Sequence, residues 1–229
     1  MNKQKILIVE DEKNLAASLR IIFEAEGFEV KVCESGNEGL SHYQEYELIV
    51  LDLMLPDMDG MDILLKIREK DQKYPVIIVS AKSEEEDLIL GLSSGADDYL
   101  TKPFLVRELV LKIKRIFERK ALYENAARNL KQEFIGSFII NFSTLVAQTT
   151  EGEKKLTSQE ANLLLYLFQN KGRIVSRQEL LEKVWGNSSE IETRTIDNFI
   201  VRFRKYFEKD SKNPMHFMTK RGVGYSFNA

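Results

Sequence analysis

The sequence predicts two domains: a doubly wound α/β domain with a five-stranded parallel sheet, followed by a smaller α+β domain. Two observations lead to this prediction. Between residues 3 and 120, five short apolar runs alternate with five stretches of helical periodicity, the pattern of buried parallel strands joined by crossover helices. From Phe134 onward short strand-like runs are followed by three helical segments, and the chain closes with a strand, a turn and a strand.

Composition bounds the class of protein. The 229 residues, 43% of them hydrophobic, suit two domains of ordinary size. Residues 1–120 hold 17 Lys and Arg against 24 Asp and Glu, a net charge of −7, whereas residues 121–229 hold 16 against 12, a net charge of +4. No apolar run approaches the ~18–20 residues of a membrane span, and the single Cys33 excludes an internal disulfide. We expect a cytoplasmic protein with no membrane association, whose basic half is compatible with nucleic acid.

Each element of the first domain has a local reason. Apolar runs bounded by acids, Gly or Pro predict strands at residues 6–9, 28–33, 48–51, 76–79 and 99–100. Periodic apolar residues predict the intervening helices: one that ends at Gly27, one capped by Ser35, one at 61–70, one from a cap at Ser83 to Leu92, and one at about 106–119. The first domain is therefore predicted to span residues 1–120.

The second domain is predicted at residues 134–229. Short strands are expected near residues 138–140 and 145–147, and a third ends at Leu156. Thr157 to Glu160 has the form of a capping box at a helix start, Ser176 begins a second helix, and a third begins near Thr193. Residues 121–133 are a linker, which either extends the preceding helix or forms a flexible connector.

Charged or hydroxyl-bearing residues follow four of the five predicted strands. Sites in parallel sheets form beyond the carboxyl ends of the strands, so Glu10, Asp11, Asp52, Ser80 and Lys102 are expected to converge. Clustered carboxylates repel one another unless a cation neutralises them, and oxygen ligands suit Mg²⁺. A carboxylate such as Asp52 can attack phosphorus, with the metal and Lys102 neutralising the incoming charge. Taken singly, each residue is better explained as a turn, a helix cap, a solvated helix start or a surface side chain, and the functional interpretation depends on their joint placement.

Three segments together resemble the receiver domain of two-component response regulators, whose sheet is flavodoxin-like. They are residues 6–12, residues 51–60 and residues 95–104, and the match extends in order over residues 3–120. The resemblance implies that Asp52 is the phosphoacceptor, that Asp11 binds Mg²⁺ directly and Glu10 mainly through water, and that the backbone carbonyl of Met54 completes the ligands. It also implies that Ser80 and Tyr99 form a switch, in which Tyr99 turns inward on phosphorylation.

The motif Asp57-Met58-Asp59-Gly60 needs a separate reading. A similar pattern occurs in phosphatases with an aspartate nucleophile and at the start of calcium loops, but the twelfth loop position counted from Asp57 is Arg68 rather than Glu. We therefore interpret the motif as the loop and turn that lead into the third helix.

The third helix of the second domain is strongly amphipathic. Ile196, Ile200, Phe203 and Phe207 form one apolar stripe, while Thr195, Asn198, Arg202 and Lys205 gather on a different face. Such a face suits the DNA major groove, although an ordinary surface helix would look similar.

Residues 194–197, 202–205 and 221–225 resemble the winged-helix effector domain of OmpR/PhoB-type regulators. The resemblance implies that the helix enters the major groove and that the wing, with Thr219 and Arg221, contacts the minor groove or phosphates; Arg194 joins the DNA-contacting set. Asp197 would orient arginines. Phe199 and Val201 stand where relatives often carry His and Arg, and Phe199 is a candidate to contact a thymine methyl group.

The resemblance also implies a symmetric dimer through the receiver. Leu88 and Leu90 occupy positions where relatives carry basic residues, whereas Glu108 is retained. We expect Asp97 with Lys112, and Asp98 with Arg119, to pair across the dimer. The face is predicted to be more apolar than in relatives, so that the chain dimerises more readily without phosphate.

Taken together, the sequence is identified as a DNA-binding response regulator rather than an ordinary enzyme. The expected partners are a sensor histidine kinase, double-stranded promoter DNA, a second copy of the chain and RNA polymerase. Two other readings stay open: a constitutive DNA-binding protein whose receiver serves only as a dimeriser, and a phosphatase-like enzyme that uses Asp52 or Asp57.

Overall fold

A computed structural model of the chain describes residues 3–129, 132–186 and 193–228, with side chains omitted from description at 121–129. Its contacts divide the chain into two compact units, residues 1–116 and 117–229. None of the helices within the described residues is long and apolar enough to cross a membrane.

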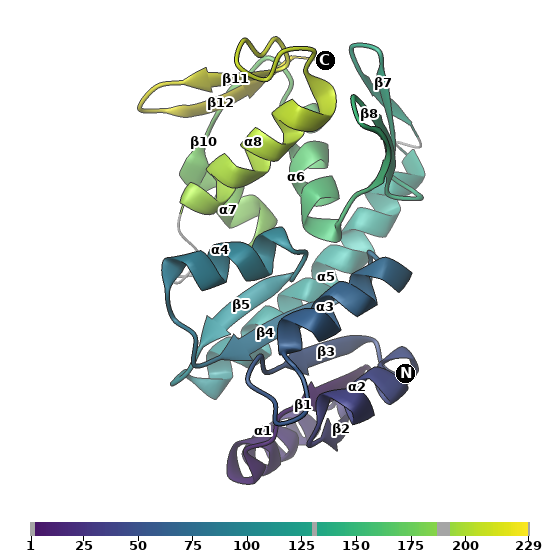
Figure 1. The fold of residues 1–229 in the computed structure, drawn as a ribbon, viewed down its shortest axis with the longest axis vertical. Coiled ribbons are helices and arrows are strands. Elements are labelled where there is room, and N and C mark those ends of the chain that lie inside the picture. Colours follow the sequence, from purple (N-terminus) through teal and green to yellow (C-terminus); the bar gives the residue numbers. More distant parts are fainter. Residues whose placement is uncertain (1–2, 130–131, 187–192, 229) are drawn as a thin grey trace. The chain divides into compact units, whose positions relative to one another are not determined.

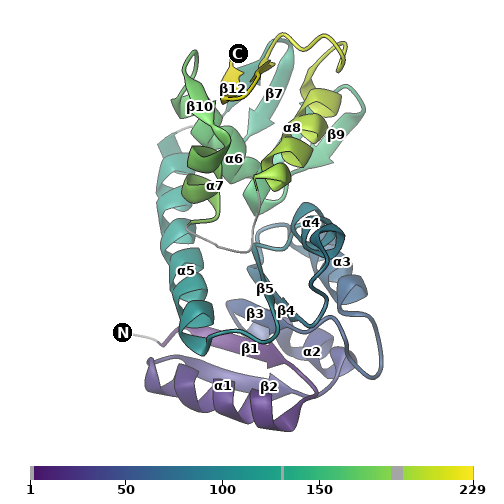
Figure 2. The same ribbon diagram turned by 90° about the vertical axis from the view of Figure 1, so that its left-hand side faces the viewer.

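The first unit is a parallel sheet between two layers of helices. Its strands are β1 (Lys5–Val9), β2 (Glu29–Cys33), β3 (Leu48–Leu51), β4 (Val76–Ser80) and β5 (Asp98–Thr101), in the order β2-β1-β3-β4-β5. Its helices are α1 (Lys13–Ala25), α2 (Gly36–His42), α3 (Gly60–Lys70), α4 (Glu85–Ser93) and α5 (Val106–Asn129), with a short 3-10 turn at Tyr43–Glu45. Figure 2 shows α1 and α5 on one face and α2, α3 and α4 on the other. The predicted doubly wound fold is confirmed.

Burial explains why these apolar runs become strands. Residues Ile6 to Val9 of β1 are fully buried, and β3 and β4 are buried along their whole length. Since helices cover both faces, the central strands have no polar side to present to water. The chain reverses its direction of winding between β1 and β3, and sites in such sheets form at the carboxyl ends of the two strands where this reversal occurs.

One predicted helix start is wrong. The cap position of α4 is Glu84, not Ser83, and no side chain caps it. Instead Glu85, Glu86 and Asp87 fill the first turn, where negative charge complements the partial positive charge of the helix amino terminus. The predicted caps Ser35 and Ser176 are confirmed.

The predicted linker is largely helical. Helix α5 continues to Asn129, so of the two expectations for residues 121–133, extension of the preceding helix is the one observed up to that residue. The domain boundaries at residues 120 and 133 stay a prediction.

The second unit packs three helices between two small antiparallel sheets (Figure 1). Strands β6 (Glu133–Ile135), β7 (Phe138–Asn141), β8 (Val146–Thr149) and β9 (Gly152–Lys155) form one sheet in sequence order. Helices α6 (Ser158–Gln169), α7 (Arg177–Val184) and α8 (Arg194–Phe207) follow, and β10 (Ile174–Ser176), β12 (Gly224–Phe227) and β11 (Phe217–Lys220) make the other sheet.

Aromatic residues join the layers of this second unit. Phe207 of α8 contacts Phe138 of β7 and Phe217 of β11, with ring centroids 6.2 Å apart in both pairs. The ring centroids of Phe227 of β12 and Phe168 of α6 lie 4.7 Å apart. The capping box predicted at Thr157 and Glu160 is present at the start of α6. Helix α8 is thus held between the sheets by its apolar stripe.

Candidate functional site

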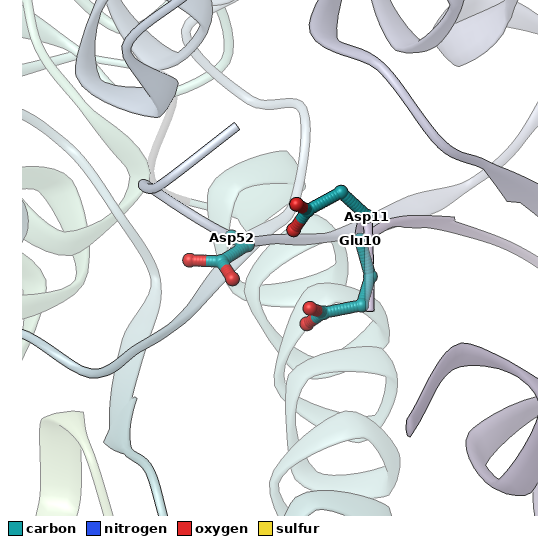
Figure 3. Close-up of side chains that lie close together, drawn as sticks. All are labelled: Glu10, Asp11 and Asp52. Carbon is teal, nitrogen blue, oxygen red and sulfur yellow. The ribbon is translucent and has the colours of Figure 1, made fainter. Parts of the chain in front are cut away.

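Three carboxylates meet at the edge of the first sheet. Glu10 and Asp11 follow β1, Asp52 follows β3, and β1 pairs with β3 so that Val9 lies opposite Leu51. One oxygen of each of the three carboxylates lies within 4.8 Å of the other two (Figure 3). Glu10 and Asp52 are buried, whereas Asp11 is exposed to solvent. The convergence predicted from the strand ends is therefore observed.

Lys102 supplies the positive charge at this edge. Its Nζ lies 2.6 Å from Asp52 Oδ2 and 2.8 Å from Glu10 Oε1, and its backbone N–H donates to the Ser80 carbonyl at 2.8 Å. The peptide bond from Lys102 to Pro103 is cis. Burial would lower the pKa of Lys102, but its hydrogen bonds to the two carboxylates raise it above its usual value, so the ammonium form is stabilised.

The acids themselves still favour a further cation. Burial raises the pKa of Glu10, and the nearby Asp52 adds to the shift, while the hydrogen bond from Lys102 opposes it. One ammonium group therefore does not fully balance three carboxylates. Three convergent carboxylate ligands, one of them open to water, form the donor set that suits Mg²⁺, a hard ion that retains several water ligands.

The loop after β3 holds Asp52 in place. Asp52 Oδ1 accepts a hydrogen bond from the Met54 backbone N–H at 2.9 Å. Because Oδ2 accepts from Lys102, both carboxylate oxygens are oriented. A Cβ atom on Gly60 would lie 2.3 Å from the Asp52 carbonyl oxygen and 2.6 Å from Leu53 Cα. Only glycine therefore lets α3 begin directly against the backbone of the Asp52 loop.

The two other acids of this loop cap helices. The Asp57 carboxylate accepts from the backbone N–H groups of Gly36 and Asn37 at 2.8 and 2.9 Å, at the start of α2. These hydrogen bonds lower the pKa of Asp57. Asp59 caps α3 by accepting from the Met61 N–H at 2.8 Å. The interpretation of Asp57 to Gly60 as a loop and turn into the third helix is confirmed.

Ser80 and Tyr99 are linked through Lys82, which sequence reasoning missed. The Lys82 N–H donates to Ser80 Oγ at 3.2 Å, and the Tyr99 hydroxyl donates to the Lys82 carbonyl at 2.9 Å. Both Ser80 and Tyr99 are fully buried, and the Tyr99 ring lies against Gly91 of α4. Tyr99 is thus already turned inward. No side-chain signal could reveal this link, because both contacts of Lys82 use its backbone.

Part of the predicted dimer face is wrong. Leu88 is buried on the same side of α4 as Gly91 and Leu92, which faces the sheet, whereas Leu90 is 54% exposed. Residues two apart on a helix point in different directions, so Leu88 and Leu90 do not line one surface.

Three residues predicted to form ion pairs across the dimer have partners within their own chain. Asp97 pairs with Arg68 of its own chain at 3.1 Å, and Lys112 pairs with Asp98 at 2.7 Å. Arg68 is buried and also donates to the carbonyls of Gly95 and Tyr74. Asp97, Asp98 and Lys112 are thus engaged within one chain. Pairing of Asp97 with Lys112, and of Asp98 with Arg119, across a dimer stays a prediction. Glu108 and Arg119 stay predicted interface residues.

Helix α8 presents a narrower polar surface than predicted. Its apolar stripe, Ile196, Ile200, Phe203 and Phe207, is fully buried, as predicted. The exposed positions recur at i, i+4, i+7 and i+11, and we call them the α8 ridge: Arg194, Asn198, Val201 and Lys205. Residues at this spacing lie one above another along a helix, so the α8 ridge is a single strip.

Three residues expected at the DNA lie elsewhere. Thr195 is buried one turn before Phe199, and Phe199 is buried with its ring 5.2 Å from that of Trp185. Neither can reach a base, so the thymine contact expected of Phe199 is wrong. Arg202 Nη1 lies 3.1 Å from Oε1 of the buried Glu160, which ties α8 to α6 rather than directing Arg202 outward.

Other polar residues join α8 to the wing, the β11–β12 hairpin. Asp197 Oδ1 accepts from Arg177 Nε at 2.7 Å and from the Tyr225 hydroxyl at 2.6 Å, so Asp197 orients an arginine as predicted. Arg204 Nη2 donates to the Phe217 carbonyl at 2.6 Å and to Thr219 Oγ1 at 2.7 Å. Thr219 is exposed, and its hydroxyl also holds the Arg204 side chain against the wing.

A buried carboxylate closes the connection between α8 and β11. Glu208 accepts from the backbone N–H groups of Met215, His216 and Phe217 at 2.7–2.9 Å. The sequence reading missed Glu208, Arg177 and Arg204, since their partners are distant in sequence or lie on the backbone. In the wing, Lys220, Arg221 and Val223 are exposed around Gly222, whose φ of +71° favours glycine at the turn.

Two protein-family models match the chain: the response regulator receiver domain over residues 6–114, and the C-terminal domain of transcriptional regulatory proteins over residues 151–227. The chain is 36% identical over 232 residues to the alkaline phosphatase synthesis transcriptional regulatory protein PhoP of Bacillus subtilis, covering 98% of this chain and 96% of PhoP. It is also 36% identical over 222 residues to the sensory transduction protein RegX3 of Mycolicibacterium smegmatis, covering 96% and 97%.

Solved structures agree with these relatives. A point mutant of RitR superposes with a TM-score of 0.74 at 28% identity, covering 98% of this chain and 99% of RitR. The response regulator DrrB of Thermotoga maritima, described as an OmpR/PhoB homolog, has a TM-score of 0.54 at 31% identity, covering both chains fully. The chain therefore belongs to the OmpR/PhoB-type family of two-component response regulators, with a receiver domain followed by a DNA-binding transcriptional regulatory domain.

Proposed function

We propose that a sensor histidine kinase donates a phosphoryl group to Asp52, and that the phosphorylated chain dimerises through its receiver and binds promoter DNA in the cytoplasm to control transcription by RNA polymerase. One observation carries the proposal. Asp52 stands at the carboxyl edge of the sheet with both oxygens oriented, between two further acids and one half-buried ammonium group. A carboxylate so placed is a nucleophile rather than a surface charge.

The residues around Asp52 support phosphoryl transfer. Lys102 would neutralise charge on the incoming phosphoryl group, and the Ser80 hydroxyl would donate a hydrogen bond to one of its oxygens. Glu10, Asp11, Asp52 and the backbone carbonyl of Met54 would hold Mg²⁺, with Glu10 acting mainly through water. When bound, the ion supplies positive charge that offsets the repulsion between these carboxylates and a phosphate.

The Ser80–Lys82–Tyr99 connection would transmit the event. A new hydrogen bond from Ser80 to a phosphoryl oxygen draws the Ser80 side chain toward Asp52, and the loop whose Lys82 N–H binds Ser80 Oγ follows it. The carbonyl of the same residue accepts from Tyr99, so α4 and β5 respond together. Among the residues predicted for dimer contact, Leu90 is exposed on α4, and Glu108 and Arg119 lie on α5.

The second domain would bind DNA with α8 in the major groove. Arg194, Asn198 and Lys205 are exposed on the α8 ridge, and Arg221 is exposed in the wing. Arg and Lys at the ends of such a strip bind phosphates or guanine, and Asn recognises adenine. Thr219 would also contact DNA from the wing, although its hydroxyl already accepts a hydrogen bond from Arg204.

Phosphate uptake tests the assignment of Asp52. The chain is incubated with Mg²⁺ and radiolabelled acetyl phosphate, and label on the protein is measured for the unmodified chain, Asp52→Asn and Asp57→Asn. We expect Asp52→Asn to lose incorporation by at least about 100-fold. Asp57→Asn is the matched control. It changes a nearby acid of the same loop, whose two oxygens accept hydrogen bonds from backbone N–H groups at the start of α2. Loss of label from Asp57→Asn with retention by Asp52→Asn would refute the proposal.

A constitutive DNA-binding regulator is the second candidate, and the inward position of Tyr99 favours it. If this position already corresponds to the active state, DNA affinity is independent of phosphate. The two candidates differ in one measurement: promoter affinity with and without a phosphoryl donor. The proposed switch requires tighter binding in the unmodified chain and no change in Asp52→Asn. A phosphatase acting through Asp57 is not favoured, since that carboxylate caps α2.

A further inference from the structure

Val201 is out of place on the surface of α8. It is 51% exposed, and it is the apolar member of a ridge whose other residues are Arg194, Asn198 and Lys205. The core does not need it, because the buried face of the helix is already filled by Ile200 and the phenylalanines. A β-branched residue is also a weak helix former. Its presence is therefore not explained by folding.

The surroundings of Val201 define what can cover it. Asn198 lies three residues before it and Lys205 four residues after it, so both are its direct neighbours on the helix surface. Arg194 lies one turn before Asn198. The strip thus has an uncharged centre of one amide and one isopropyl group, between two cations. Cations at both ends match the phosphates on the two sides of a groove.

The major groove of DNA offers a partner of matching chemistry. A thymine presents its C5-methyl group there, and the adenine of an A·T pair presents an acceptor and a donor that an Asn amide can bind together. Side chains three residues apart on a helix are roughly 5–6 Å apart at Cβ. Asn198 and Val201 can therefore reach the same or neighbouring base pairs. Phe199 is buried and Arg202 pairs with Glu160, so neither competes for this position.

We propose that Val201 is a specificity-determining residue, which packs against a thymine methyl group beside an adenine bound by Asn198. Each half-site then contains adjacent A·T pairs at the position under the centre of the α8 ridge. The inference rests on the proposed function only in that α8 enters the major groove.

Removal of single methyl groups from the DNA tests the contact. Preferred sites are selected from a random duplex library with the full chain treated with acetyl phosphate and Mg²⁺. Each thymine of a selected site is then replaced by deoxyuridine, which lacks only the methyl group. At one position in each half-site we expect the affinity of the unmodified chain to fall about fourfold, the effect of one buried methyl group. With Val201→Ala we expect the same replacement to cost less than about 1.5-fold.

Val223→Ala is the matched control, because Val223 is an equally exposed valine in the wing turn. It should keep the methyl sensitivity at the position assigned to Val201. Equal sensitivity in the unmodified chain and Val201→Ala, or no sensitive thymine at all, would overturn the inference while leaving sequence-specific binding intact. Failure of the library to yield any preferred site would instead overturn the proposed function.

Discussion

The two units use buried and half-buried charge in opposite ways. In the receiver, cations and acids converge: Lys102 contacts both Glu10 and Asp52 at the edge where chemistry is proposed. In the DNA-binding unit, some cations bind partners within the domain and others are exposed to solvent. Arg202 and Arg204 of α8 bind partners of their own domain, whereas Lys205 of the same helix is exposed.

This difference shows what decides the role of an arginine. Arg202 and Arg204 lie on the same helix as the exposed Lys205, yet a buried carboxylate and a backbone carbonyl hold them within the fold. Position on the helix and the presence of an acceptor determine whether a cation is structural or available to a ligand. In the receiver, the role of a charged residue is determined by its position in the backbone, because each site residue follows the end of a strand.

The largest expected effect is on the buried ion pair of the receiver. Arg68→Met leaves Asp97 without its cation and removes donors to the carbonyls of Gly95 and Tyr74. We expect the free energy of unfolding to fall by about 3–5 kcal/mol, measured by urea titration. Arg20→Met is the control, since the Arg20–Glu24 pair is exposed and should contribute less than about 1 kcal/mol. Equal losses in the two variants would show that the buried pair is not special.

A comparison of Arg202→Ala with Lys205→Ala sharpens the division of roles on α8. Arg202→Ala removes the partner of the buried Glu160, and we expect stability to fall by about 1.5–3 kcal/mol with an unchanged salt dependence of DNA binding. Lys205→Ala should leave stability within about 0.5 kcal/mol and reduce the salt slope by about one. Denaturation and binding titrations at several salt concentrations measure both. A salt slope altered by Arg202→Ala alone would reverse the assignment.

A smaller effect is expected between α8 and the wing. Tyr225→Phe removes the hydroxyl that donates to Asp197, and we expect a loss of about 0.5–1.5 kcal/mol in stability. Burial, aided by the hydrogen bond to Asp197, raises the pKa of Tyr225 to about 12. Since the folded pKa is raised above the usual value of 10, this contribution is complete below pH 10 and is lost as the pH rises through about 12.

Ultraviolet titration of the phenol measures that shift directly. The difference between the titrations of the unmodified chain and Tyr225→Phe should show one phenolate transition near pH 12. In Asp197→Ala the pKa of Tyr225 should move toward 10. A Tyr225 transition near pH 10 in the unmodified chain would contradict the hydrogen bond as the link between helix and wing.

Much of the receiver could be predicted from the sequence. An apolar run of four or five residues identifies each buried strand, and parallel strands align their carboxyl ends, so Glu10, Asp52 and Lys102 were expected together and are found together. What escaped prediction depends on backbone groups. The Lys82 link and the anchoring of Asp57 to α2 involve N–H and C=O groups that every residue possesses.

Helix α8 was predicted only in part. Periodicity identified the buried stripe, but not which polar residues at its margins find partners inside the domain. Thr195 and Arg202 lie at such margins, and the acceptor of Arg202 is Glu160, 42 residues away in sequence. Strand β10 was missed for a related reason: three residues show no periodicity, and only pairing with β12 defines it.

The carboxylate of Glu208 fixes the segment that joins α8 to the wing before any ligand binds. It gathers three consecutive N–H groups at the point where the chain leaves α8 and turns back to β11, so the segment adopts its shape as the domain folds. Helix and hairpin then meet a duplex as one preformed surface, with little conformational freedom left to lose on association. Tight binding then becomes achievable with a small contact area.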